Sequence, residues 1–351
     1  MNKRKILICG EFPPATITGI SVSNQQISNL LKNEEFVVDY IEENTWNKNI
    51  IGKCLQLFQI HIKVLGKSLF QRYDIFYYNI PLSVFGLLKD IFLILPFSLF
   101  SNKNITIGHI HRGDIKDFVN NNRLKRFLFR FVLKRSRKII VLSDSLMRDL
   151  DSFYQHPNIL ILPNTSAIES KSFVPREYGR KFICIANYIR TKGISDLVAC
   201  FSDDDMKDYK LSLFGNVYDQ DFFDDLERQA SNNIQFNKAV KRDEIKETLQ
   251  AFDALILPSW NEGQPIILLE AMSIGIPVIT TDVGDIPDML GVDYPYVAKS
   301  QNKRSLKEAV QRFNQNKEKK RISEYLFQRY HAKYSNDNYQ KKVLNIFKSV
   351  E

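Results

Sequence analysis

The chain has 351 residues, 44% hydrophobic and 25% charged, which is typical of a folded protein with about two domains and excludes a disordered chain. Its four cysteines (Cys9, Cys54, Cys184 and Cys200) show no C-x-x-C spacing, so we expect buried reduced thiols in a cytosolic protein. The net charge is +9, and residues 1–170 carry 22 Lys+Arg against 14 Asp+Glu, whereas residues 171–351 carry 27 against 26. A basic first half predicts an anionic partner: nucleic acid, an acidic membrane or a phosphorylated substrate.

The first half alternates short apolar runs with helical patterns, as expected of a parallel sheet covered by helices. The predicted strands are residues 5–10, 36–41, 75–79, 105–110, 138–142 and 159–162. Helices are predicted over residues 22–31 and 50–70. No signal peptide is visible before the first strand. The loop after that strand contains Gly19 but lacks G-x-G-x-x-G, which counts against a dinucleotide dehydrogenase.

The most apolar stretch of the chain is residues 82–100. Lys89 and Asp90 interrupt it and leave ten residues, 91–100, without charge. This is about half of what a bilayer-spanning helix needs. We therefore predict a buried or half-buried helix whose end is able to touch lipid.

His111 lies in the sequence HRGD, directly after the predicted strand 105–110. Open α/β sheets bind ligands at the carboxyl ends of their strands, and an imidazole there is suited to donate to a sugar hydroxyl or to support a forming charge. A structural turn residue is the other interpretation. His109 is expected to face the same side, which raises a two-histidine metal site, but no carboxylate or cysteine set completes one, and we predict no metal.

Residues 123–138 (RLKRFLFRFVLKRSRK) contain eight basic residues and no acidic one. Phe127, Leu128 and Phe131 are predicted to share one helical face, which makes the segment amphipathic as well as basic. Such a helix fits an anionic membrane surface, although a solvated helix covering the sheet would show the same pattern. We expect no nucleic-acid binding, because no binding motif is present and the aromatic residues are predicted to face a core.

The second half begins after Pro163 and Asn164. Residues 166–179 are polar and predict a linker, and residues 182–186 and 211–215 predict the first strands of a second domain. A final helix is predicted over residues 334–350.

Residues 254–284 (ALILPSWNEGQPIILLEAMSIGIPVITTDVG) predict a strand, a turn, a helix and a second strand. The strand covers residues 254–257, the turn contains Gly263, and Pro265 is expected as the first helical residue. The helix runs to residue 274 and the next strand covers residues 278–281.

Free N–H groups and the positive end of the helix dipole gather after Gly263, which suits a phosphate. Glu270 is expected roughly 8 Å farther along the axis, where an ionised carboxylate would accept hydrogen bonds from a diol such as a ribose. Glu262 in the turn is free to meet a second hydroxyl-bearing group. A diphosphate with a sugar on each side is a nucleotide sugar.

These motifs resemble family 4 retaining glycosyltransferases of the GT-B fold. The resemblance rests on E-x7-E (Glu262 and Glu270) with Gly263 and Pro265, followed by EAM and GIPVITTDVGDIPD. It is dense from residue 182 to 288 and thinner before residue 138. It implies an α/β protein of two Rossmann-like domains facing across a cleft, with a C-terminal helix crossing back to the first domain. The expected domains are 1–165 with about 334–351, and 180–333, joined by a linker at 166–179.

The resemblance also implies roles for single residues. His111 and Glu262 would serve the transferred sugar as catalytic residues. The donor-binding residues would be Gly19, Arg190, Lys192, Gly263, Gln264, Pro265 and Glu270, with no metal. Lys192 would contact the donor diphosphate, and Glu270 the ribose.

Two positions depart from the family pattern. Asn187 stands where the family has an arginine, and Arg190 in the same loop is expected to supply the missing charge. Gln264 replaces a common aromatic residue, which is expected to alter the sugar pocket.

The implied activity is transfer of a sugar, with retention, from a nucleotide diphosphate sugar (a UDP- or GDP-sugar) to a hydroxyl. No cofactor or metal would be required. By analogy the acceptor is a lipid-linked saccharide, in bacterial surface polysaccharide assembly at the inner face of the cell membrane, with the protein cytoplasmic and peripheral. Two alternatives stay open: a GT-B-fold sugar-nucleotide epimerase, and a catalytically silent homologue that binds a partner.

Overall fold

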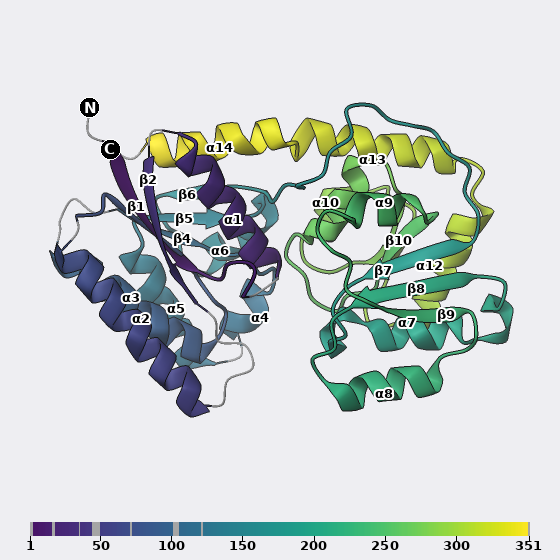
Figure 1. Ribbon diagram of the computed structural model, residues 1–351, viewed down its shortest axis with the longest axis horizontal. Coiled ribbons are helices and arrows are strands. Elements are labelled where there is room, and N and C mark those ends of the chain that lie inside the picture. Colours follow the sequence, from purple (N-terminus) through teal and green to yellow (C-terminus); the bar gives the residue numbers. More distant parts are fainter. Residues whose placement is uncertain are drawn as a thin grey trace. The chain divides into compact units, whose positions relative to one another are not determined.

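The structure is a computed structural model, which describes residues 3–15, 18–34, 36–43, 50–70, 72–100, 105–120 and 122–349. The chain divides into two compact units, one comprising Met1–Pro163 with Tyr339–Glu351 and the other Asn164–Asn338. Each unit contains one six-stranded parallel sheet. The predicted α/β class, with two parallel sheets and helices between their strands, is confirmed (Figure 1).

The sheet of the first unit has the strand order β2-β1-β3-β4-β5-β6. Its strands are β1 (Arg4–Gly10), β2 (Phe36–Glu42), β3 (Ile75–Asn79), β4 (Ile105–His109), β5 (Lys138–Val141) and β6 (Ile159–Ile161). The helices are α1 (Gly19–Lys32), α2 (Ile50–Phe70), α3 (Val84–Phe100), α4 (Ile115–Asn120), α5 (Arg123–Arg135) and α6 (Asp144–Phe153), to which most of α14 (Asn336–Lys348) is added. α1 begins three residues earlier than expected, because Thr18 and Ser21 form a capping box at its start.

Helices cover both faces of the first sheet. Successive side chains of a strand point to opposite faces, and the strands carry apolar side chains on both of them. Leu7 and Cys9 of β1 pack in one core with residues of α2 to α6. Ile6 and Ile8 pack in the other with α1 and α14. α14 contributes Tyr339, Val343, Ile346 and Phe347 to that second core.

The predicted apolar face of α5 needs a correction. The helix buries Leu128, Phe129, Val132 and Leu133, whereas Phe127, predicted to share the face of Leu128, is 66% exposed. The buried stripe is shifted because the side of α5 that packs against α3 and α4 is the side of Phe129 and Val132.

None of the helices within the described ranges combines the length and the apolar character that crossing a bilayer requires. The helix predicted within residues 82–100 is α3, in which Leu87, Leu93, Ile94 and Phe97 are buried.

The sheet of the second unit has the order β12-β11-β10-β7-β8-β9. Its strands are β7 (Lys181–Ile185), β8 (Lys210–Gly215), β9 (Ile234–Lys238), β10 (Ala254–Leu257), β11 (Val278–Thr281) and β12 (Val297–Ala298). Its helices are α7 (Ile194–Phe201), α8 (Gln220–Gln229), α9 (Ile245–Gln250), α10 (Ile266–Ser273), α11 (Ile286–Leu290), α12 (Lys303–Gln315) and α13 (Lys319–Lys333), with short 3₁₀ turns η1 (Arg190–Lys192) and η2 (Asp204–Met206).

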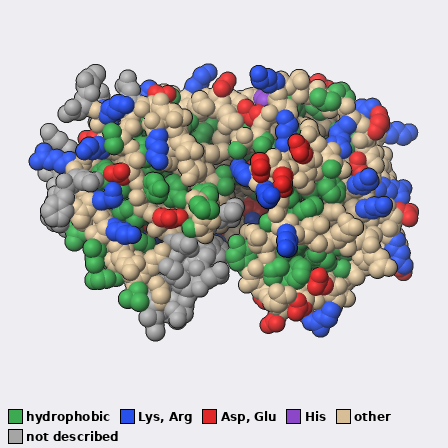
Figure 2. Space-filling model, in the orientation of Figure 1, with side chains coloured by type: hydrophobic (Ala, Val, Ile, Leu, Met, Phe, Trp, Pro, Cys, Tyr) green, Lys and Arg blue, Asp and Glu red, His purple; other side chains and the backbone are tan. Residues whose placement is uncertain are grey.

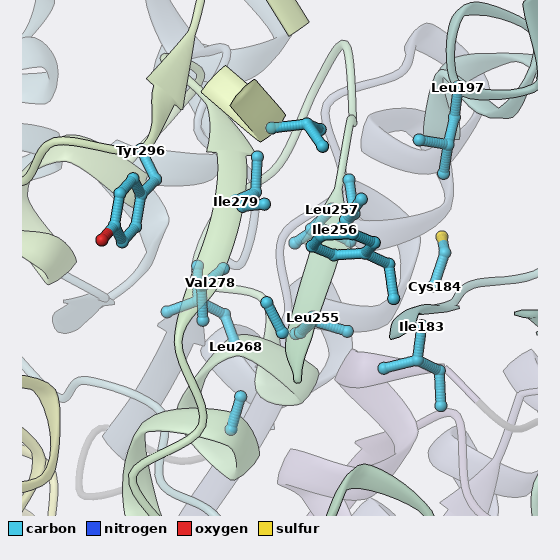
Figure 3. Packing of buried hydrophobic residues seen from close by; sticks show 14 of the residues in the cluster. Ile183, Cys184, Leu197, Leu255, Ile256, Leu257, Leu268, Val278, Ile279 and Tyr296 are labelled. Atoms are coloured by element: carbon cyan, nitrogen blue, oxygen red, sulfur yellow. The ribbon is translucent and has the colours of Figure 1, made fainter. Parts of the chain in front are cut away.

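The core of this unit is centred on β10 and β11. Leu255, Ile256 and Leu257 pack with Val278 and Ile279, and all are buried (Figure 3). This continuous apolar run is the pattern of a strand covered on both faces. It fixes the carboxyl end of β10, from which the turn with Glu262 leads to α10.

The predicted linker 166–179 lies within the second unit. Ser170 donates a backbone hydrogen bond to the carbonyl of Ser273, and the hydroxyl of Tyr178 donates to Ser323 Oγ at 2.6 Å. The segment therefore packs along its own domain.

Candidate active site

The strand–turn–helix of residues 254–273 forms as predicted, with β10 ending at Leu257 and α10 beginning at Ile266. Pro265 occupies the position before the first helical residue (φ −66°, ψ 124°), one place earlier than expected. α10 has no acidic residue in its first turn, so its positive dipole end keeps no compensating carboxylate there.

Lys192 and Glu262 lie together in the second unit. Lys192 Nζ is 2.7 Å from Glu262 Oε1, and the same oxygen accepts a hydrogen bond from Ser259 Oγ at 2.7 Å. The carboxylate of Glu262 is largely buried and the ammonium of Lys192 is about one third exposed. Two residues separated by 70 positions thus form one charged pair beside the start of α10.

Two glycines allow this close approach. Gly193 has φ +66°, and a Cβ there would lie 2.0 Å from the carbonyl oxygen of Pro258. Gly284 has φ +55°, and its Cβ would lie 1.9 Å from the carbonyl oxygen of Glu262. Only glycine takes such a backbone conformation without strain and leaves room for the neighbouring chain, so both turns are held against the segment that carries Glu262.

Glu270 lies on α10 with its side chain almost fully buried. Arg242 Nη1 is 2.9 Å from Glu270 Oε1, which is the distance of an ion pair. The two groups are not aligned as a hydrogen bond, and this oxygen accepts no hydrogen bond among the described residues. Burial raises the pKa of Glu270 to about 7, and the nearby Arg242 opposes part of this shift. A buried carboxylate with acceptor capacity to spare is the group that a diol would satisfy.

Arg190 lies in η1, two residues before Lys192. Its guanidinium stacks over Phe222 at 4.7 Å and is 3.9 Å from the carboxylate of Asp219, so its charge is directed to the start of α8. Asn187 accepts hydrogen bonds from Asn216 through its amide oxygen. The structure therefore gives Arg190 and Asn187 partners at this end of the sheet.

Gln264 is buried and forms several hydrogen bonds. Its side-chain oxygen accepts from the backbone N–H of Asn164, its own carbonyl accepts from Asn164 Nδ2, both at 2.9 Å, and its amide donates to Asp285. The side chain predicted to alter the sugar pocket thus also ties the turn after Gly263 to residue 164.

In the first unit, His111 lies at the carboxyl end of β4, and Asn79 ends the neighbouring strand β3. Asn79 Nδ2 is 2.9 Å from His111 Nε2, and Asn79 Oδ1 accepts from Asn24 Nδ2 at 2.7 Å. Asn24 Nδ2 also donates to the backbone carbonyl of Glu11 at 3.0 Å. Three side chains from α1, β3 and the end of β4 form one relay.

This relay determines the tautomer of His111. The carbonyl of Glu11 can only accept, which orients the amide of Asn24, and that orients the amide of Asn79. Asn79 therefore donates to Nε2 of His111, and the neutral ring carries its proton on Nδ1. Burial lowers the pKa of His111 to about 3, so the ring is neutral at pH 7 and presents one donor.

His109 packs beside His111, with ring centroids 3.8 Å apart. Its Nδ1 is 2.6 Å from the hydroxyl of Tyr77, and its Nε2 is buried without a hydrogen-bond partner among the described residues. Burial, and the neighbouring His111, lower the pKa of His109 well below its usual value. No cluster of three or more His, Cys, Asp or Glu that could hold a metal occurs in the part of the chain that is described.

A cavity of about 260 Å³ opens beside His111 within the first unit. Its polar lining includes His111, Asn79, Glu11, Lys89 and Arg112, and its apolar lining comes from α2 and α3 and the loop before α3. Lys89 pairs with Glu43 at 2.5 Å. Gly19 starts α1 beside Ile20, which is also in the lining. The cavity can therefore hold a molecule with a polar and an apolar part.

The sequence did not reveal Asn24, Asn79 or Arg242 as parts of these sites. Asn79 had one usable signal, since it ends a predicted strand beside the one that leads to His111. Arg242 lies in an exposed, charge-rich loop and carries no such signal.

Residues 166–329 match the model of the family "Glycosyl transferases group 1". An uncharacterized glycosyltransferase of Methanocaldococcus jannaschii, MJ1178, is 25% identical over 339 residues, which cover 90% of this chain and 89% of that protein. The UDP-Gal:alpha-D-GlcNAc-diphosphoundecaprenol alpha-1,3-galactosyltransferase of Escherichia coli is 33% identical over 76 residues, 20% of each chain. Two other curated relatives are matched over only 19% and 50% of their lengths.

Among solved structures, sucrose-phosphate synthase from Thermosynechococcus elongatus has a TM-score of 0.80 at 15% identity, covering 99% of both chains. The Anabaena protein Alr3699/HepE, in complex with UDP and glucose, has a TM-score of 0.70 at 12% identity, covering 99% of this chain and 100% of that one. At these identities the likeness shows the fold. Together with the two parallel sheets, it confirms the predicted two-domain GT-B architecture. The matching group 1 domain, the relative similar along nearly the whole chain and the fold support one coarse conclusion: the chain is a glycosyltransferase of the GT-B fold.

Proposed function

We propose that the protein transfers a sugar from a nucleotide diphosphate sugar to a hydroxyl of a lipid-linked saccharide, with retention of configuration, as a family 4 enzyme. The observation that carries the proposal is the Lys192–Glu262 pair beside the start of α10, the helix that also bears the buried Glu270. A cation, free helix N–H groups and two carboxylates in that order match a diphosphate flanked by two sugars.

In this mechanism the departing diphosphate receives the charge of Lys192 and the N–H groups after Gly263, which are oriented before reaction and lose little energy in reorganising. Arg190 supplies further charge when it leaves Asp219. Glu270 accepts hydrogen bonds from the ribose, and Glu262 from the donor sugar. Gln264 and Pro265 complete the part of the donor site in the second unit through the backbone of their loop. The role of Gly19 at the donor phosphates is the one that the family resemblance implies.

His111 presents its Nδ1–H to the reacting sugar as a neutral donor, in the tautomer that Asn79 imposes. The transition state resembles an oxocarbenium ion, as in other glycosyl chemistry. No metal or other cofactor takes part, because the cations and helix N–H groups neutralise the diphosphate.

We propose UDP or GDP as the nucleotide of the donor. UDP is favoured by the UDP complex of the Anabaena structural neighbour, and the diphosphoundecaprenol named for the Escherichia coli relative supports a lipid-linked acceptor. Together with the eight basic residues of segment 123–138, this favours a peripheral protein on the anionic inner face of a bacterial cell membrane, acting in surface polysaccharide assembly of the O-antigen or capsule type.

The test is a thermal-stabilisation screen with UDP-, GDP- and dTDP-sugars, followed by incubation of the stabilising donor with and without a lipid-linked saccharide. We expect one base to stabilise the protein and the sugar to appear on the acceptor only when both are present. An isomerised donor without acceptor would replace the proposal by an epimerase. Donor binding without turnover on any acceptor would replace it by a silent homologue.

A further inference from the structure

Helices α2 and α3 of the first unit carry exposed apolar stripes. On α2 these are Leu55, Phe58, Ile62 and Leu65, and on α3 they are Phe85, Leu88 and Phe92. The spacings of three and four residues place each set on one side of its helix. Phe58 is 66% exposed and Phe92 57%, whereas an ordinary surface exposes such side chains singly.

The two stripes form one surface. α2 and α3 pack side by side (Figure 1), and the ring of His61 lies 5.4 Å from that of Phe92. In Figure 2, hydrophobic side chains gather at the lower left, where Figure 1 shows these helices. α5 packs on α3 and adds Leu124 and Phe127 with the same helical spacing. We call the outer sides of these three helices the α2–α3–α5 face.

The charge of this face has one sign. The sequences of α2, α3 and α5 contain a single carboxylate, Asp90, which is fully buried. Arg123, Arg130 and Lys134 are exposed on α5. Arg130 also stacks over Tyr154 at 5.5 Å, and within the described ranges none of the basic side chains of α5 forms an ion pair with a carboxylate. A surface that contacts only solvent ordinarily carries charges of both signs.

The cavity beside His111 is bounded by the same helices. Leu57 of α2 and Phe85 of α3 line it, and Phe85, which belongs to the apolar stripe of α3, is 47% exposed. An amphiphile with its polar end near His111 would therefore carry its chain directly onto the α2–α3–α5 face.

We propose that the α2–α3–α5 face docks on an anionic lipid bilayer, with the apolar stripes of α2 and α3 entering the headgroup boundary and the cations of α5 facing lipid phosphates. The inference rests on the proposed function insofar as it explains how a lipid-linked acceptor reaches the cavity. Cations that have no carboxylate partner among the described residues, beside exposed aromatic side chains, fit a surface that is anionic outside and apolar beneath. A protein partner would need carboxylates to match the same cations.

The test is co-sedimentation of the full chain with vesicles of phosphatidylcholine alone or mixed with phosphatidylglycerol. We expect binding to the mixed vesicles that weakens as salt is raised. The double variant Phe58→Asp/Phe92→Asp should bind at least tenfold more weakly. Arg123→Gln/Arg130→Gln/Lys134→Gln should bind more weakly and lose most of the salt dependence. Val292→Asp is the matched control, because Val292 is 99% exposed in the second unit.

Equal vesicle binding by Phe58→Asp/Phe92→Asp and the unaltered chain, or no binding to either vesicle, would overturn the proposal. A concentration-dependent dimer that the double variant abolishes, without vesicle binding, would assign the face to a second copy instead. Thermal stabilisation by the donor, measured on the same variants, separates the two hypotheses, since loss of docking leaves donor binding intact. Docking without any donor binding would instead remove the proposed function and leave the face.

Discussion

The candidate residues of the second unit form ion pairs, whereas those of the first unit are neutral and hydrogen-bonded. In the second unit cations lie against carboxyl groups in advance, Lys192 at Glu262 and Arg242 at Glu270. In the first unit His111 is neutral and oriented by the amides of Asn79 and Asn24. A half that must bind a diphosphate needs opposite charge, and a half that must meet a sugar needs oriented hydrogen bonds, so the difference is the one that the proposed reaction requires.

The largest effect is expected when the backbone that supports the Lys192–Glu262 pair is moved. Gly193→Ala should destabilise the protein by about 2 kcal/mol or more, because the new Cβ meets the carbonyl of Pro258 and φ stays positive. Thermal or denaturant unfolding measures this. Gly66→Ala in α2 is the matched control, since its Cβ meets nothing within 4 Å, and it should be neutral or slightly stabilising. Equal effects of the two would argue against the close approach.

Removing one charge of the pair tests the second unit directly. Lys192→Ala should lower the rate of transfer at least tenfold, about 1.4 kcal/mol, because the diphosphate loses its cation and Glu262 loses its partner. The measurement is kcat/KM with a saturating acceptor. Lys207→Ala, an exposed lysine that pairs with Asp204, is the control and should leave the rate unchanged.

Glu270→Ala should also lower transfer at least tenfold, and Glu270→Gln should change the pH dependence. Because burial raises the pKa of Glu270 to about 7 from its usual 4.5, the folded state holds its proton longer, and the free energy of unfolding falls as pH rises from about 4.5 to about 7. Donor binding, which uses the ionised form, should strengthen over the upper part of that range. Unfolding and donor titrations between pH 4.5 and 8 should lose both trends in Glu270→Gln. Unchanged transfer by both Glu270→Ala and Lys192→Ala would remove the donor-site assignment.

The first unit should respond to pH in the opposite direction. The pKa of His111 is about 3 in the folded state against 6.5 ordinarily, so its contribution to stability is complete above pH 6.5 and is lost as pH falls toward 3. His111→Gln should reduce this acid sensitivity, as measured by unfolding between pH 3 and 7. A His111 that titrates near 6.5 by nitrogen NMR would contradict the neutral assignment.

The smallest expected effect concerns the relay. Asn79→Ala should lower kcat a few-fold while leaving donor affinity unchanged, because His111 keeps its place but loses the donor that fixes its proton on Nδ1. The ¹⁵N shifts of His111 should then show a mixture of tautomers. Asn316→Ala, in a loop of the second unit, serves as the control. A single unchanged tautomer in Asn79→Ala would show that another group fixes the ring.

Local patterns predicted most elements within one or two residues. β10, β11 and α2 have the predicted bounds, because continuous apolar runs and helical periodicity depend on neighbouring residues alone. The spacing of Glu262 and Glu270 likewise predicted their place at the turn and on α10.

Partners brought together by the fold could not be predicted in this way. Asn79 and His111 are 32 residues apart, and Arg242 meets Glu270 from a loop without any motif. The predicted buried face of α5 was wrong for the same reason. The periodicity of a helix rich in both Phe and Arg does not determine which of its apolar stripes packs against α3. Such choices are made by tertiary packing.

The position of α14 in the chain affects the order in which the first unit can fold. The hydrophobic layer beneath β1 and β3 is closed by Tyr339, Val343 and Phe347, which are translated after every residue of the second unit. During synthesis, this face of the first sheet is therefore covered by α1 but not by α14 until the second unit has emerged from the ribosome. The first unit therefore cannot complete its core in N-to-C order, and a fragment ending near residue 163 would expose the part of its sheet that α14 covers.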